Sequence, residues 1–159
     1  MANGTTILRG WLVLNGLYID IVSLYLLPVF APAVAAAWPW PNLGAVFGGA
    51  GADGAALSPD SFAARQIASG FLIHGIVRTA AGLVAPGSGG DTTGSKALGW
   101  LAVASYLVEF ANFAVEVPRG TATDPAGLVL CPVLAYLCYA CLVCADTGTG
   151  AAADGKKRA

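Results

Sequence analysis

Four long apolar stretches, separated by polar or glycine-rich sequence, dominate the hydrophobic pattern of this chain. They cover residues 8–27, 62–85, 97–117 and 125–145. Each approaches the roughly 20 residues that cross a hydrocarbon core as a helix rising about 1.5 Å per residue. Pro28 follows the first stretch directly, whereas Pro132 lies inside the fourth, where lipid-embedded helices tolerate a kink. The pattern predicts an all-α fold: a four-helix transmembrane bundle forming a single domain over residues 1–159, with a short tail at 146–159.

The first stretch has an alternative interpretation as a secretory signal, because "FAPAVAAAW" follows it and supplies small residues of the kind a signal peptidase accepts. An apolar signal core runs only about 7–15 residues. The stretch here is longer and is interrupted by Asn15 and Asp20. We therefore interpret it as a membrane span.

The segments between the spans have loop composition. Residues 28–60 are rich in proline, glycine and alanine without a sustained period, and "PGSGGDTTGSK" joins the second and third spans. Trp38 and Trp40 in the first loop either rest at the membrane interface, where indole rings are enriched, or are two incidental residues of a loop.

Composition and charge narrow the class of protein. Hydrophobic residues make up 57% of the chain and charged residues 11%, against about half and a quarter in soluble domains, so membrane lipid is the expected surroundings. A net charge of −1 provides no basic surface for nucleic acid. The balance of lysine and arginine across short loops predicts that both termini are cytosolic. Six basic residues fall toward one face (Arg9, Arg78, Lys96, Lys156, Lys157 and Arg158) and two toward the other (Arg65 and Arg119).

The chain ends in Lys-Lys-Arg-Ala, which places Lys156 and Lys157 in the form of an endoplasmic-reticulum retrieval signal on a cytosolic tail. A receptor reads such an address, and it does not anchor the protein. The alternative is a basic flank that orients the fourth span. We expect retrieval, and hence a multi-pass protein of the endoplasmic-reticulum membrane.

A few polar residues interrupt the spans at similar depth. Asp20, His74 and Glu109 each lie about 17–20 Å from the cytosolic end of their span, and Arg78 shares a helix face with His74. Isolated charges at such depth are costly, so they are expected to pair inside the bundle. The expected pairs are Arg78 with Glu109 or Asp20, with His74 as a hydrogen-bonding neighbour. We favour a role in helix packing over catalysis or transport.

The motifs of common catalytic and cofactor sites are missing from the sequence. It has one histidine, no di-iron histidine boxes, no G-x-G-x-x-G and no G-x-S-x-G. The cysteines of the fourth span (Cys131, Cys138, Cys141 and Cys144) lack the converging turns that hold a metal, so we interpret them as a helix–helix interface. The prediction is a protein without cofactor, metal or enzymatic activity.

Several segments, in order, resemble the ergosterol biosynthetic protein 28 family. They are "TTILRGWLVLNGLYI", "SFAARQIASGFLIHGIVRTAAGLV", "ASYLVEFANFAVEVPRGTA" and the terminal "KKRA". Positions that match the family's pattern are Arg9, Trp11, Ala64, Arg65, Arg78, Tyr106, Glu109, Gly120, Thr121 and Ala122. The resemblance implies a non-catalytic scaffold of the endoplasmic reticulum that tethers the oxidase, dehydrogenase and ketoreductase of sterol C-4 demethylation.

Helix association in such a scaffold requires close packing at small residues, and Gly70, Gly75, Ala81 and Gly82 are the expected positions in the second span. The same packing would also allow a homo-oligomer. Two alternatives stay open. One is a small sterol or lipid isomerase that uses Asp20, His74 and Glu109 as acids and bases. The other is an accessory subunit of an organellar membrane complex.

Overall fold

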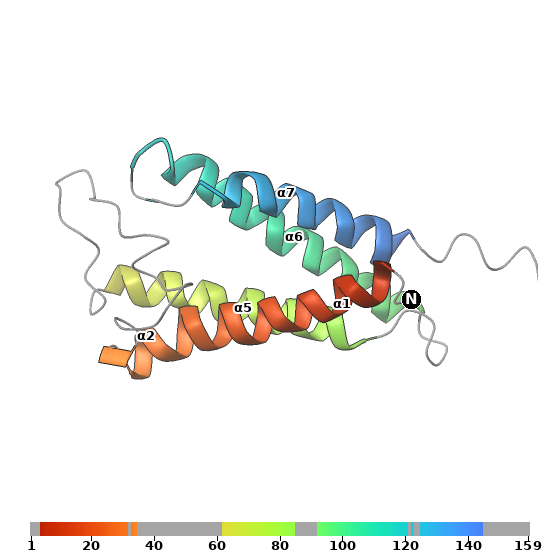
Figure 1. Ribbon diagram of the computed structural model, residues 1–159, viewed down its shortest axis with the longest axis horizontal. Coiled ribbons are helices and arrows are strands. Elements are labelled where there is room, and N and C mark those ends of the chain that lie inside the picture. Colours follow the sequence, from red (N-terminus) through yellow and green to blue (C-terminus); the bar gives the residue numbers. More distant parts are fainter. Residues whose placement is uncertain are drawn as a thin grey trace, which may run out of the picture.

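A computed structural model of the chain describes residues 4–31, 33–34, 62–84, 92–120, 122 and 125–144, and these form four long helices (Figure 1). The first consists of α1 (Gly4–Leu14), a π-helical continuation η1 (Asn15–Leu26) and the short α2 (Leu27–Phe30). The others are α5 (Phe62–Leu83), α6 (Thr92–Glu116) and α7 (Gly127–Cys138), which η2 (Tyr139–Val143) continues as a π-helix. No strand occurs among the described residues. The predicted all-α class is confirmed.

Two prolines lie inside helices and do not end them, although proline often ends a helix. The first helix was expected to end before Pro28 but continues to Phe30. Pro28 is the second residue of α2 and lies near the C-terminal end of the continuous helix Gly4–Phe30, which ends within three residues of it. Pro132 lies inside α7, and the helix continues past it to Cys138.

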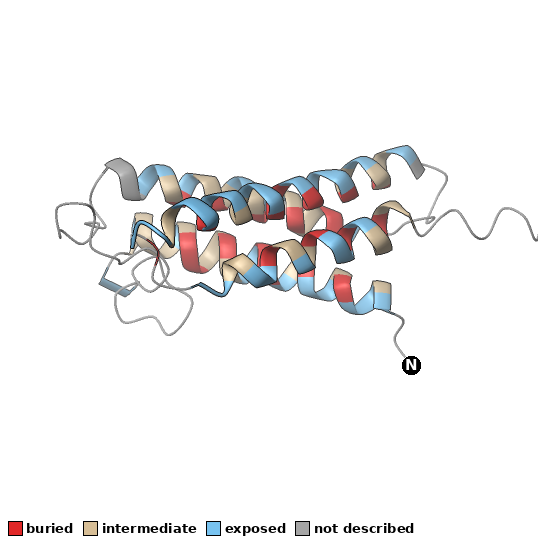
Figure 2. Cartoon of the chain, turned by 90° about the horizontal axis from the view of Figure 1, so that it is seen from above, coloured by how far each residue is buried: buried red, intermediate tan, exposed pale blue. Residues whose placement is uncertain are grey.

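The four helices form two antiparallel pairs. The first helix packs along α5, and α6 packs along α7 and η2. The pairs meet where α5 contacts α6, and α1 also contacts η2 near the end of the bundle that holds the N-terminus (Figure 1). Figure 2 shows the buried residues turned toward the middle of the bundle and exposed residues on the outside of every helix.

The apolar core lies mainly between α6 and α7, with contributions from α1 and α5. Leu12 and Ala102 are fully buried in it, as is Cys138. Along α7 and η2 the buried positions are four, three and four residues apart, which keeps them on one helix face. These positions are Cys131, Ala135, Cys138 and Leu142. Two of the four cysteines thus serve as small core residues, and Cys141 packs against the same cluster.

Glycines bring the backbones of η1 and α5 unusually close. An ideal Cβ atom placed on Gly75 would lie 2.6 Å from the carbonyl oxygen of Gly16, and one on Gly16 would lie 2.6 Å from the carbonyl oxygen of Gly75. Further along, a Cβ on Gly82 would lie 2.7 Å from the carbonyl oxygen of Arg9. Of the small residues expected to mediate packing, Gly75, Ala81 and Gly82 are buried. Gly70 was expected there too, but a Cβ on it would meet nothing within 4 Å.

Gly120 forms the turn that ends α6. Its φ angle is 73°, in the left-handed region that favours glycine. This turn lets the Ala122 amide donate to the carbonyl oxygen of Glu116 at 3.3 Å, and Ala122 is buried. The turn accounts physically for the glycine of the Gly-Thr-Ala motif, although Thr121 lies outside the described residues.

Replacing Gly120 by alanine should lower the stability of the fold by about 1–2 kcal/mol, because a Cβ atom disfavours the left-handed conformation. Thermal unfolding of the purified protein in mild detergent measures the effect. Gly10→Ala is the control, since Gly10 lies within the α1 helix with nothing within 4 Å of its Cβ position. If the two variants melt at the same temperature, the turn does not depend on glycine.

Two of the four helices are long and apolar enough to cross a membrane by length and composition alone, Gly4–Phe30 and Thr93–Glu116. The helix Gly127–Val143 is apolar but shorter. The helix α5 has sufficient length but carries Arg65, His74 and Arg78, which lower its hydropathy. Four membrane spans therefore remain a prediction. Length and composition support a span for two of the four helices.

Candidate functional site

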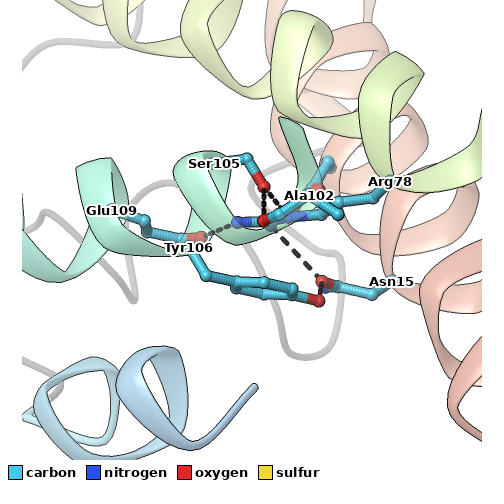
Figure 3. A network of polar contacts seen from close by, with 7 residues as sticks. Asn15, Arg78, Ala102, Ser105, Tyr106 and Glu109 are labelled. Atoms are coloured by element: carbon cyan, nitrogen blue, oxygen red, sulfur yellow. Dashed lines mark hydrogen bonds and ion pairs between the residues drawn. The ribbon is translucent and has the colours of Figure 1, made fainter. Parts of the chain in front are cut away.

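Buried and half-buried polar side chains from three helices meet at Arg78 (Figure 3). Arg78 comes from α5 and is 1% exposed. We call the side chains that meet here the Arg78 cluster. Its members are Asn15, Asp20, Arg78, Ser105, Tyr106 and Glu109.

Two members of the cluster, Asn15 and Asp20, lie on η1. The Arg78 Nη1 atom donates to Asp20 Oδ2 at 2.9 Å and to Asn15 Oδ1 at 3.3 Å. In an α-helix, residues five apart point about 140° away from each other. In a π-helix the backbone bonds join residues five apart, which brings such residues onto one face. The π-helical form of η1 therefore explains how both side chains reach the same guanidinium nitrogen.

The side of the cluster on α6 consists of Ser105, Tyr106 and Glu109. The Arg78 Nε atom donates to Ser105 Oγ at 3.1 Å, and Nη2 donates to Glu109 Oε2. The guanidinium also lies 3.8 Å above the centre of the Tyr106 ring, within the range of a cation–π contact (Figure 3). Arg78 therefore binds both helix pairs at once, η1 on one side and α6 on the other.

Both hydroxyl donors of the cluster already have acceptors. Tyr106 donates its hydroxyl proton to Asn15 Oδ1 at 2.6 Å, and Ser105 donates to the carbonyl oxygen of Ala102 at 2.8 Å. Three nearby buried atoms have no hydrogen-bond partner among the described residues. They are Asp20 Oδ1, His74 Nδ1 and Thr79 Oγ1.

The sequence offered Glu109 or Asp20 as the partner of Arg78, and the structure joins Arg78 to both. His74 was expected to be a hydrogen-bonding neighbour, but its Nδ1 atom makes no hydrogen bond, and its ring instead makes an edge contact with Phe71. Asn15 and Ser105 were not predicted to belong to this cluster. Ser105 lies four residues before Glu109 and shares its helix face, a signal that was available. Asn15 could not be placed without knowing that the helix is a π-helix.

The remaining residues of the family-like motifs lie mostly toward the helix ends. Arg9 donates from Nε to the carbonyl oxygen of Gly82 at 2.9 Å and from Nη2 to that of Leu83 at 3.0 Å. It thus binds the last carbonyls of α5, where a cation also interacts favourably with the helix dipole. Trp11 is partly exposed on α1, and Arg65 is exposed near the start of α5. The side chain of Ala64, the loop tryptophans and the tail lysines Lys156 and Lys157 lie outside the description.

The chemistry of the site is that of an interior ion-pair network. None of the four cysteines forms a disulfide, and within the described ranges no three histidine, cysteine or acidic side chains are grouped to hold a metal ion. The guanidinium of arginine is planar and can donate several hydrogen bonds at once, so it is suited to positioning carboxylates. The Arg78 cluster links the two helix pairs through directional bonds.

Comparison with protein-family models, curated proteins and solved structures finds no match to this chain. The resemblance to the ergosterol biosynthetic protein 28 family therefore rests on the sequence motifs alone.

Proposed function

We propose that this protein is a non-catalytic, multi-pass scaffold of the endoplasmic-reticulum membrane that tethers the enzymes of sterol C-4 demethylation. The observation that carries the proposal is an inverted distribution of polarity. On α5, Arg78 is 1% exposed while Ile73 and Ile76 are 63% and 56% exposed. In water this arrangement is unfavourable, because it buries charge and exposes large apolar side chains.

The same inversion supports four spans, including the two helices that fall short on hydropathy or length. Large apolar side chains are exposed on all four helices, and on α7 Val129 and Tyr136 are more than 60% exposed. Such surfaces suit lipid tails and the helices of other membrane proteins. The charged groups inside are bonded to one another, which leaves the outer faces of the helices as the surface for partners.

Two further parts of the proposal come from the sequence. The motif resemblance names the partners as the oxidase, dehydrogenase and ketoreductase of sterol C-4 demethylation. The dilysine Lys156 and Lys157 supports residence in the endoplasmic reticulum through retrieval.

Affinity capture of the tagged full chain from membranes in mild detergent tests the proposal. The three C-4 demethylation enzymes should be recovered together, and the purified chain alone should not convert a C-4-methyl sterol. A tagged endoplasmic-reticulum membrane protein of unrelated function, captured in the same detergent, is the control. Recovery of none of the three enzymes above that control contradicts the scaffold. Sterol turnover by the chain alone favours the isomerase-type alternative.

A further inference from the structure

The formal charges of the Arg78 cluster do not balance. One guanidinium, that of Arg78, forms ion pairs with two carboxyl groups, those of Asp20 and Glu109. A net charge in a poorly polarisable interior is strongly unfavourable unless it is compensated. The second carboxyl group therefore needs either another cation or a bound proton.

The groups that face Asp20 do not supply another cation. Among the described residues near the Arg78 cluster, His74 is the one group besides Arg78 that can become positive, and it interacts with Arg78 and Glu109. His74 is paired with neither carboxyl group: its buried Nδ1 atom has no hydrogen-bond partner, and no ion pair joins its ring to Asp20 or Glu109 among the described residues. The titratable groups that interact electrostatically with Asp20 are Arg78 from α5, Glu109 and Tyr106 from α6, and Cys131 from α7, whereas His74 interacts with Arg78 and Glu109.

Asp20 is the carboxyl group whose surroundings suit a neutral acid. Its side chain is 1% exposed, against 16% for Glu109. Its Oδ1 atom accepts no hydrogen bond that would stabilise a negative charge, and its Oδ2 atom accepts only from Arg78 Nη1, which also donates to Asn15. The hydroxyl groups of Tyr106 and Ser105 donate elsewhere, so they do not stabilise a negative charge on Asp20.

We propose that the Arg78 cluster is a proton-binding site in which Asp20 carries the proton and Glu109 remains the ionised counter-ion of Arg78. The bound proton makes the cluster electrically neutral. Its release would leave a net negative charge between the two helix pairs, so the packing of η1 and α5 against α6 depends on whether the proton is bound. This inference concerns the charge of the cluster and does not rest on the scaffold function.

Infrared spectroscopy of the purified full chain in mild detergent at neutral pH tests the site. The native protein should show the C=O stretching band of a protonated carboxylic acid, and Asp20→Asn should abolish it while leaving the melting temperature nearly unchanged. Glu116→Gln is the matched control, because Glu116 is a partly exposed carboxyl group at the end of α6, and the band should persist in it.

Replacing Glu109, the other carboxyl group, gives a second infrared test of the charge of the cluster. In Glu109→Gln, Asp20 should release its proton to become the counter-ion of Arg78, so the band should again be lost. The variant with both amides leaves Arg78 without an anion and should accumulate poorly or melt far below either single variant. A native protein without the band, or a band that survives Asp20→Asn, overturns the proposal, and both outcomes can be read even if the double variant does not fold.

Discussion

Replacing Arg78 by leucine should destabilise the protein by roughly 3–5 kcal/mol, the range measured when one partner of a buried ion pair is removed. The change leaves Glu109 without its cation and removes the donor that Asp20, Asn15 and Ser105 share. It also removes the contact between η1 and α6 that passes through the guanidinium. Most domains are stable by only about 5–15 kcal/mol, so a large fall in protein level and melting temperature is expected.

A double-mutant cycle separates this pairing from a general loss of packing. Arg78→Leu with Glu109→Leu should recover part of the loss, because the remaining carboxyl group of Asp20 is neutral when it holds a proton. Repeating the cycle with Asp20→Asn present removes any dependence on that proton. Strictly additive losses in both backgrounds would show that Arg78 and Glu109 do not stabilise each other.

The exposed pair of Arg119 and Glu116 provides the matched control. It lies at the far end of α6 with an Nη1 to Oε1 distance of 3.3 Å, and the Arg119 side chain is 67% exposed. Ion pairs in such surroundings contribute about 0–1 kcal/mol. Arg119→Leu should therefore change the melting temperature little, and a loss comparable to that of Arg78→Leu would mean that burial does not set the effect.

Gly75→Ala should have the second large effect. An added Cβ would lie 2.6 Å from the carbonyl oxygen of Gly16 and 2.5 Å from Ile21 Cγ1, closer than real Cβ atoms come to other heavy atoms. Backbone atoms cannot move aside as a flexible side chain does, so η1 and α5 must separate. Overpacking of this kind costs about 1–3 kcal/mol, and separation here also displaces Asp20 from Arg78.

Gly70→Ala on the same helix is the control, because nothing lies within 4 Å of the added Cβ. Alanine also has the higher helix propensity, so this variant should melt at or slightly above the native temperature. The comparison is made by thermal unfolding in one detergent. Equal melting temperatures for the two variants would contradict the close crossing of η1 and α5.

The sequence by itself determined the helical class, the approximate extent of the helices and the candidate charges. Apolar stretches of this length leave few alternatives, because their backbone polar groups can be satisfied within a helix whatever surrounds it. Isolated charges in such stretches must find partners, so Asp20, Arg78 and Glu109 could be named as a group. The resemblance to a scaffold family also came from the sequence alone.

Only the tertiary structure decided how these residues meet. The π-helical form of η1 places Asn15 and Asp20 on one face, and no periodicity in the sequence reveals this, because an apolar run reads the same for either helix type. How η1 and α5 are rotated determines that the helices cross at Gly16 and Gly75 and that Gly70 lies away from this crossing. Helix rotation is set by long-range packing between segments far apart in the chain, which is also why Arg78 binds both acids where the sequence could offer only one or the other.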